Sequence, residues 1–243
     1  MELLETYFEL LPRPLSASTV RRFLEVTIGE YGWVVPARYG RLSTDNRVSA
    51  ADPVAELLEF YEREGQLVTK GRGGDLMIST PRGQPGGYLV WFTNAASAVK
   101  ASWLARHRSQ MVTVAKLIES PLAYAGLQRV HSSKLLREIA LEQGSQAVPR
   151  LRGYQEGLLG LYWRNVLGPP FSSLIRDRLE ALKDGGDVAD LGGGYWFLQS
   201  YDWPTDALSD DGRLRERQLI EQLGDDLFYD MVNERPPTRR PRL

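Results

Sequence analysis

The sequence contains no cysteine among its 243 residues. This absence excludes disulfide bonds, zinc sites built on thiolates and cysteine nucleophiles. Histidine is nearly as scarce: His107 falls on the apolar stripe of a predicted helix, and His131 falls at the end of a predicted strand. Neither belongs to a His-Glu-x-x-His spacing or has an evident serine partner. We therefore predict two core or interface histidines, no metal, no cofactor and no enzymatic activity.

Long hydrophobic runs are also lacking. No window approaches the roughly 18 consecutive apolar residues of a membrane span. The segment from Met1 to Tyr7 has neither the basic region nor the apolar region of a secretion signal. Apolar residues make up 42% of the chain and charged residues 25%, which is ordinary for a globular protein. We expect a cytoplasmic protein of bacterial type with no membrane partner.

The sequence has no complete phosphate-binding loop and no basic stripe. Gly71–Gly74 resembles part of such a loop, but it lacks the Gly-Lys-Ser/Thr ending and leads into a predicted strand. Gly192–Gly194 fails the same test, and we expect a tight turn at each place. Lysine and arginine are scattered along the chain, with no stripe interleaved with aromatic residues. The sequence therefore predicts no direct binding of nucleic acid.

What is present is an irregular alternation of strand-like and helix-like segments. Alternating side chains from Leu3 to Leu11 predict a half-buried strand, and Asp52-Pro53 is typical of a helix start whose helix ends at Gly65. Three short runs on glycine turns then leave no room for crossover helices and predict an antiparallel meander; they are Gln66–Lys70, Asp75–Thr80 and Gly87–Thr93. We predict an α+β fold: a mostly antiparallel central sheet with helices packed over its faces.

The rest of the chain extends this pattern. A strand is expected at Leu122–His131, and a strand pair at Val188–Leu191 and Tyr195–Tyr201. Apolar periodicity predicts helices over five further segments: Ala96–Glu119, Lys134–Leu141, Leu158–Leu167, Phe171–Lys183 and Asp210–Gln222. No repeat or linker is evident, so we predict one domain over residues 1–234, with a possible seam at residues 144–153. The Pro/Arg-rich residues 235–243 are expected to be a mobile tail.

Charge is unevenly distributed, although the net charge is only −1. Between Tyr201 and Glu234 there are ten carboxylates and three arginines, a net charge of −7 for this segment. Such a segment is either a solvated helix face or a surface that attracts a basic partner. Aromatic residues gather just before and within it: we expect Trp163 and Trp196 to be core residues, and Trp203 to be either a turn residue packed on Pro204 or an exposed anchor.

Aromatic and glycine patterns in the chain resemble the immunity proteins of bacterial polymorphic-toxin and type VI secretion systems. They are most similar to immunity family 52, which neutralises toxin domains of the restriction-endonuclease type. Four segments carry the resemblance: Tyr7–Leu10, Tyr88–Phe92, Tyr162–Pro169 and Tyr195–Asp226. It implies a cytoplasmic protein that protects the producing cell by binding a cognate secreted toxin, which we expect to be a basic nuclease domain.

An inhibitor of this kind needs no catalytic residues, and an acidic surface would steer it into the basic channel of a nuclease. We predict that the toxin contacts one surface, hereafter the acidic surface, with Trp203 as its anchor; its residues are Tyr201, Asp202, Trp203, Asp206, Asp210 and Asp211. Two other functions stay open. One is a hydrolase or nucleotide-processing enzyme whose site is assembled by tertiary contacts, and the other is a structural adaptor of a secretion or phage-defence assembly.

Overall fold

The computed structural model describes residues 2–80, 86–96, 100–141, 144–151 and 153–241. The described chain packs as two compact units, Leu3–Ala123 and Tyr124–Leu243, with Glu2 grouped with the second. The predicted seam at residues 144–153 lies inside the second unit. That the chain behaves as a single domain stays a prediction.

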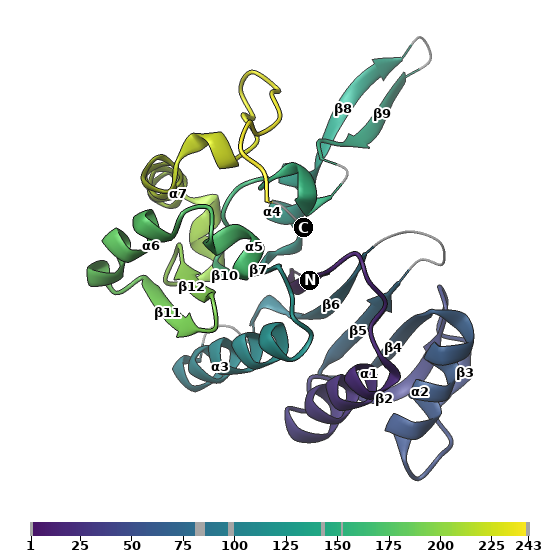
Figure 1. The fold of residues 1–243 in the computed structure, drawn as a ribbon. Coiled ribbons are helices and arrows are strands. Elements are labelled where there is room, and N and C mark those ends of the chain that lie inside the picture. The colour runs from purple at the N-terminus through teal and green to yellow at the C-terminus, as the bar shows by residue number, and fades with distance from the viewer. Residues whose placement is uncertain (1, 81–85, 97–99, 142–143, 152, 242–243) are drawn as a thin grey trace. The chain divides into compact units, whose positions relative to one another are not determined.

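The first unit is built on an antiparallel sheet (Figure 1). Its strand order is β1-β6-β5-β4-β2-β3. The predicted meander is confirmed as β4, β5 and β6, because each of these strands pairs antiparallel with the next. The strands are β1 (Leu3–Leu10), β2 (Val35–Gly40), β3 (Asn46–Arg47), β4 (Gln66–Arg72), β5 (Gly74–Ser79) and β6 (Gly87–Asn94).

Three helices belong to the first unit: α1 (Ala17–Leu24), α2 (Pro53–Glu64) and α3 (Ala101–Leu117). Helix α1 continues as a π-helical segment, Glu25–Glu30, and packs against α2 and α3. The predicted caps are confirmed. The Asp52 carboxylate accepts hydrogen bonds from the first amides of α2, and Gly65 ends that helix in the left-handed conformation.

The core of the first unit is centred on Trp33, which is buried just before β2. Its ring stacks on that of Trp91 with centroids 4.6 Å apart. Its indole N–H donates to Oε1 of Gln110 at 2.9 Å, and its backbone carbonyl accepts from the Trp91 indole at 3.0 Å. The buried polar atoms of both tryptophans are therefore satisfied.

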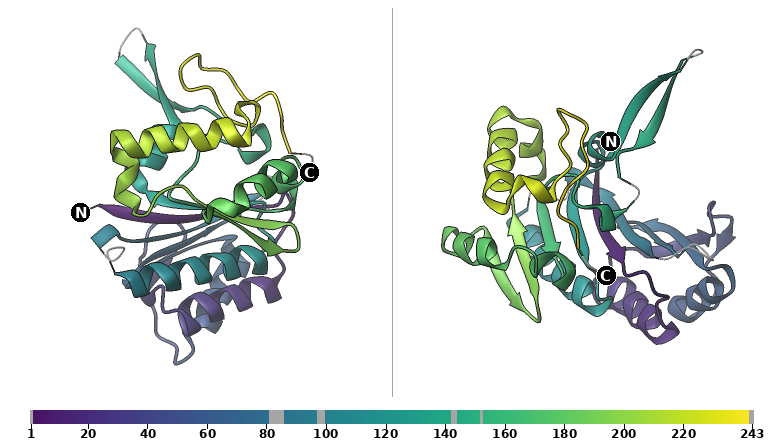
Figure 2. Two further views of the ribbon diagram at one scale, coloured as in Figure 1. Left: turned by 90° about the vertical axis from the view of Figure 1, so that its left-hand side faces the viewer. Right: turned by 45° about the horizontal axis from the view of Figure 1, so that its top comes forward.

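The second unit has its own strands and a separate hairpin (Figure 2). The order is β11-β12-β10-β7, and β12 pairs antiparallel with both of its neighbours. The first two residues of β7 are grouped with the first unit. The strands are β7 (Leu122–Leu127), β10 (Arg164–Leu167), β11 (Val188–Gly192) and β12 (Tyr195–Gln199), and the hairpin is β8 (Leu136–Leu141) with β9 (Gly144–Pro149).

The helices of the second unit lie between and after these strands. Helix α7 follows β12 along the chain, packs against α6 and confirms the predicted helix from Asp210. The predicted helix Phe171–Lys183 is divided between two helices. The elements are α4 (Gln128–Leu135), α5 (Pro169–Ser172), α6 (Arg176–Leu182) and α7 (Asp210–Leu223).

Two predicted helices are wrong. Lys134–Leu141 spans the end of α4 and all of strand β8. Leu158–Leu167 contains an irregular stretch and then β10, whose four residues are all buried. A short apolar run that is buried on both faces has no strand-like alternation, so periodicity cannot distinguish it from a helix. The predicted strand Leu122–His131 is too long. It ends at Leu127, and helix α4 begins at the next residue, Gln128.

Part of the predicted tail is bound to the second unit. The amides of Thr238 and Arg239 both donate to the carbonyl of Asp226, at 3.1 and 2.9 Å, and Pro237 is buried. The Arg239 guanidinium also donates to the carbonyl of Leu174. Residues 242–243 lie outside the described residues. The mobility of residues 235–243 stays a prediction, although the described part of this segment has defined partners.

The predicted fold class is confirmed. The structure is α+β, with mostly antiparallel sheet strands and helices packed on them. The predicted helix from Ala96 begins instead at Ala101, with residues 97–99 outside the described part.

Replacing the central tryptophan tests the core of the first unit. We expect Trp33→Ala to lower the free energy of unfolding by about 3 to 5 kcal/mol, because it leaves a cavity and an unpaired Gln110. Urea unfolding followed by circular dichroism measures the change. The control is Leu42→Ala, whose side chain is 76% exposed and whose loss should cost less than about 0.5 kcal/mol. Equal losses for the two variants would contradict this account of the core.

Candidate functional site

The acidic surface is formed by the connection from β12 to α7. After β12 the chain enters a short 3-10 helix, Pro204–Leu208, whose first position is a proline. The Asp206 carboxylate accepts from the Trp203 amide at 2.9 Å, and the Trp203 carbonyl accepts from the Asp206 amide at 3.1 Å. These reciprocal bonds fix the turn that carries Trp203.

The start of α7 is fixed by Ser209 and Gly212. The Ser209 hydroxyl accepts from the Gly212 amide at 3.0 Å and donates to the carbonyl of Asp206 at 2.8 Å. A Cβ on Gly212 would lie 1.9 Å from that same carbonyl oxygen, so no larger residue fits without moving the backbone. Asp210 and Asp211 occupy the first turn, where the helix dipole favours negative charge.

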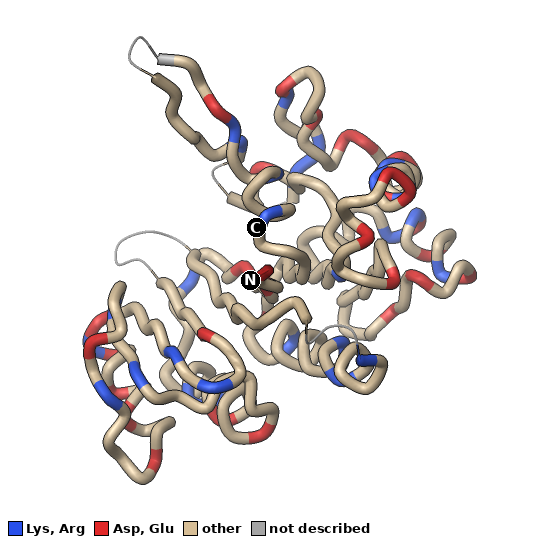
Figure 3. Tube along the Cα trace, turned by 180° about the vertical axis from the view of Figure 1, so that it is seen from behind, with Lys and Arg blue, Asp and Glu red and all other residues tan. Residues whose placement is uncertain are grey.

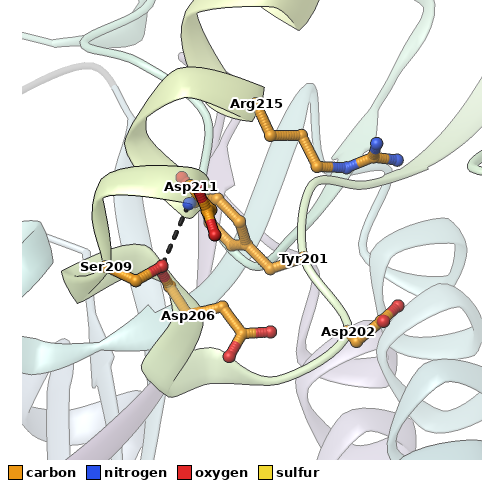
Figure 4. Close-up of a pocket in the computed structure, with 7 residues that line it drawn as sticks. Tyr201, Asp202, Asp206, Ser209, Asp211 and Arg215 are labelled. Atoms are coloured by element: carbon orange, nitrogen blue, oxygen red, sulfur yellow. Dashed lines mark hydrogen bonds between the residues drawn. The ribbon is translucent and has the colours of Figure 1, made fainter.

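These elements enclose an open hollow of about 440 Å³. Figure 4 shows its lining side chains, which come from the connection after β12, the 3-10 helix and the first turns of α7. Among the described residues, the carboxylates of Asp202 and Asp211 have no hydrogen-bonding or ionic partner. The lining consists of Tyr201, Asp202, Asp206, Ser209, Asp211, Gly212 and Arg215.

The one cation in this lining is already engaged. The Arg215 Nε donates to the carbonyl of Ser200 at 2.9 Å, and its guanidinium forms an ion pair with Asp187 on the chain segment before β11. Arg215 therefore forms no ion pair with Asp202, Asp206 or Asp211. The hollow has an excess of negative charge, and a guanidinium or ammonium group would complement it.

The structure brings together four of the six predicted contact residues: Tyr201, Asp202, Asp206 and Asp211 line one hollow. The other two lie outside the lining. Asp210 is 96% exposed in its side chain and pairs with Arg213 at 2.6 Å. Trp203 is 40% exposed, which is unusual for the largest apolar side chain, and its neighbour Pro204 is buried. The contact role of all six residues stays a prediction.

Trp163, Trp196 and both histidines are buried, as predicted, but His131 lies on helix α4 and not at the end of a strand. Trp163 and Trp196 are buried core residues. The Trp163 indole also donates to the carbonyl of Asp202 at 3.2 Å, which ties the backbone of the acidic surface to a core residue. His107 and His131 are buried, and their Nε2 atoms meet Thr6 at 2.8 Å and Tyr124 at 2.7 Å.

A partly buried charge cluster adjoins the hollow at Tyr201 and was not predicted from the sequence. The Glu216 carboxylate, on α7, accepts from the Tyr201 hydroxyl at 2.7 Å and from the Leu161 amide at 3.0 Å. It also pairs with the Lys134 ammonium at 2.5 Å, and this ammonium donates to the carbonyl of Leu161 as well. The ammonium lies 4.8 Å from the centre of the Tyr162 ring. These residues are far apart in the sequence, and no local pattern links them.

The cluster has defined protonation states. Burial lowers the pKa of the Lys134 ammonium below its ordinary value, and the Glu216 charge opposes this shift. Burial, followed by the nearby Glu216 charge, raises the pKa of the Tyr201 phenol above its ordinary value. Tyr201 therefore stays protonated at neutral pH, and its hydroxyl donates a hydrogen bond to Glu216. This bond fixes one wall of the hollow.

Within the described ranges, no group of three or more histidine, aspartate or glutamate side chains is placed to hold a metal ion. Over the same residues, no helix is both long enough and apolar enough to span a bilayer.

Comparison with known proteins gives a likeness of fold. No family model matches the chain, and no curated protein sequence matches it. Among solved structures, it resembles the Pseudomonas aeruginosa T6SS protein PA0821, with a TM-score of 0.64 and 12% sequence identity. The match covers 96% of this chain and 74% of the other. At this identity the likeness concerns the fold alone.

Removal of the partly buried Glu216 carboxylate tests whether the cluster holds α7 in place. We expect Glu216→Gln to lower the free energy of unfolding by about 3 kcal/mol at neutral pH, because Lys134 loses its counter-charge. The folded-state pKa of Lys134 should then fall further. The loss of stability relative to the wild type is greatest below that pKa, and it diminishes as the pH rises toward the folded-state pKa of Lys134 in the wild type.

Denaturant titrations at several pH values measure this dependence. The matched control is Glu221→Gln, an exposed carboxylate on the same helix, which should change the stability by less than about 0.5 kcal/mol at every pH. A Glu216→Gln variant that behaved like this control would show that the cluster does not stabilise the fold.

Proposed function

We propose that this protein is a cytoplasmic immunity protein, which binds a cognate secreted toxin and protects the producing cell by occluding it. The observation that carries the proposal is the acidic hollow at the start of α7, with two carboxylates that have no partner among the described residues and an exposed tryptophan beside it. The toxin would be a nuclease, because the substrate channel of a nuclease is basic.

The chemistry of the hollow supports a basic protein partner. An arginine or lysine side chain entering between Asp202 and Asp211 would gain charge-assisted hydrogen bonds from groups that have no partner within the described chain. The surrounding carboxylates of the −7 segment would accelerate association through long-range attraction. A fixed, preorganised hollow also lowers the entropic cost of binding, and the Glu216 cluster supplies that rigidity.

Trp203 supplies the apolar part of the proposed interface. Tryptophan is enriched among residues whose truncation costs binding energy, and such anchors lie in the centre of a contact with polar residues around them. Trp203 is suited to such a role, because it is 40% exposed, Asp202 precedes it, and its amide is bound to the Asp206 carboxylate.

The fold likeness supports an association with type VI secretion. The matched protein is described as a T6SS protein, and the likeness extends over 96% of this chain. The narrower assignment to immunity family 52 rests on the sequence resemblance. Inhibition by stoichiometric binding is also compatible with a hollow that has polar walls and no metal-binding group among the described residues.

Binding to the toxin encoded beside this gene tests the proposal. We expect a Kd of roughly nanomolar strength or tighter, and an association rate that falls as salt rises. Trp203→Ala should weaken binding by about 2 kcal/mol or more, mainly through faster dissociation. Asp202→Asn with Asp211→Asn should mainly slow association and reduce its salt dependence.

Matched changes at other exposed positions serve as controls. Val232→Ala removes another exposed apolar side chain, and Glu59→Gln with Glu62→Gln removes two exposed carboxylates of α2. Both should leave the affinity unchanged. Killing by the toxin despite co-expression of this protein would overturn the immunity function. Tight binding that is unaffected by the Trp203 and Asp202/Asp211 variants would support the immunity function but show that the toxin binds elsewhere than the acidic surface.

A further inference from the structure

The open edge of the first unit's sheet carries a row of cations. In the register of the strands, Arg47 on β3 lies opposite Arg38 on β2, and Arg38 lies opposite Lys70 on β4. Side chains at paired positions project from the same face of a sheet, and Arg72 shares this face because it lies two residues beyond Lys70. We call these four residues the basic sheet edge. Figure 3 shows Lys and Arg segments on neighbouring strands of this unit.

The cations of the basic sheet edge repel one another, although their exposure to water keeps this cost small. Neighbouring strands are about 4.8 Å apart, so three cations are aligned over about 10 Å, and like charges at opposed positions are destabilising. Lys70 has a partner in Asp75 at 3.6 Å. Arg38, Arg47 and Arg72 are exposed and have no hydrogen-bonding or ionic partner for their side chains among the described residues. Their arrangement fits an anionic ligand.

Apolar side chains accompany these cations. Val35, which pairs with Arg72 at the start of β2, is 48% exposed, and Leu42, which follows β2, is 76% exposed. Arg41, next to Leu42, extends back to Gln66 on β4 with a hydrogen bond of 3.2 Å. Charges alone would suit a polyanion such as nucleic acid. Cations together with exposed aliphatic groups favour an acidic protein surface that has an apolar group of its own.

A surface with these properties exists on this chain. The acidic surface of the second unit has unpaired carboxylates at Asp202 and Asp211 and an exposed apolar ring at Trp203. We propose that the basic sheet edge of one molecule binds the acidic surface of a second copy, with an arginine of the edge entering the hollow. The contact is heterologous, because it joins two different surfaces, and it generates closed rings or open chains.

This self-association has a consequence for the acidic surface. The proposed toxin contact and the second copy would use the same hollow, so they exclude one another. The resting protein would be self-associated, and a tighter toxin would dissociate it by mass action. The self-association itself does not rest on the proposed function, since it is measured on the purified chain alone.

Charge reversal on each surface provides the test. Sedimentation velocity of the full chain at about 0.05 M salt should show association that weakens at least tenfold in affinity at about 0.5 M salt. Arg38→Glu with Arg47→Glu should be monomeric, and so should Asp202→Arg with Asp211→Arg. An equimolar mixture of the two variants should associate again, because each then offers the charge that the other needs.

A matched control separates this contact from a general effect of charge. Arg21→Glu with Arg106→Glu changes the net charge equally at two exposed arginines on α1 and α3, and it should associate like the wild type. The proposal is overturned if the wild type is monomeric at low salt, or if the mixture of reversed variants stays monomeric. It is also overturned if the basic sheet edge shifts a labelled single-stranded oligonucleotide while the protein stays monomeric, since that result would assign the cations to nucleic acid.

Discussion

The acidic surface depends on one largely buried carboxylate, that of Glu216, whose side chain is 13% exposed. This side chain joins the middle of α7 to the connection after β12 through Tyr201, to the loop before β10 through the Leu161 amide, and to α4 through Lys134. A buried charge of this kind is tolerated only when its counter-charge and hydrogen bonds are all supplied. The cost of leaving any of them unpaired therefore ties these four segments to a single arrangement. The shape of the hollow depends on this arrangement, because Tyr201 and α7 line it.

Charged groups have partners in the Glu216 cluster, whereas several charged groups on the surface do not have one among the described residues. In the Glu216 cluster, each charged or phenolic group has a partner, because an unpaired polar group is costly in surroundings of low polarity. On the rim of the hollow, Asp202 and Asp211 have no side-chain partner within the described part of the chain, and the same holds on the first unit for Arg38, Arg47 and Arg72. Water can solvate these exposed groups, so the fold tolerates them at little cost. Unpaired charges of opposite sign on separate surfaces are what a protein that acts by docking requires.

Local sequence patterns predicted much of the fold. The caps of α2 at Asp52 and Gly65, the glycine-turned meander of β4, β5 and β6, and the helix after Ser209 all depend on neighbours within a few residues. The composition of the Tyr201–Glu234 segment likewise indicated an acidic surface, and four of its six predicted residues line the hollow. The failures were short segments such as Arg164–Leu167, whose burial on both faces removed the alternation that identifies a strand.

The sequence by itself determined the fold class, the absence of cysteine chemistry and the concentration of carboxylates around Trp203. Each of these is a property of composition or of short-range order. Only the tertiary structure decided that Lys134 meets Glu216, 82 residues later. It also decided that Arg47, Arg38 and Lys70, which are scattered in the sequence, form one row. Contacts of this kind arise from strand register and from packing between distant elements, which no local pattern of residues encodes.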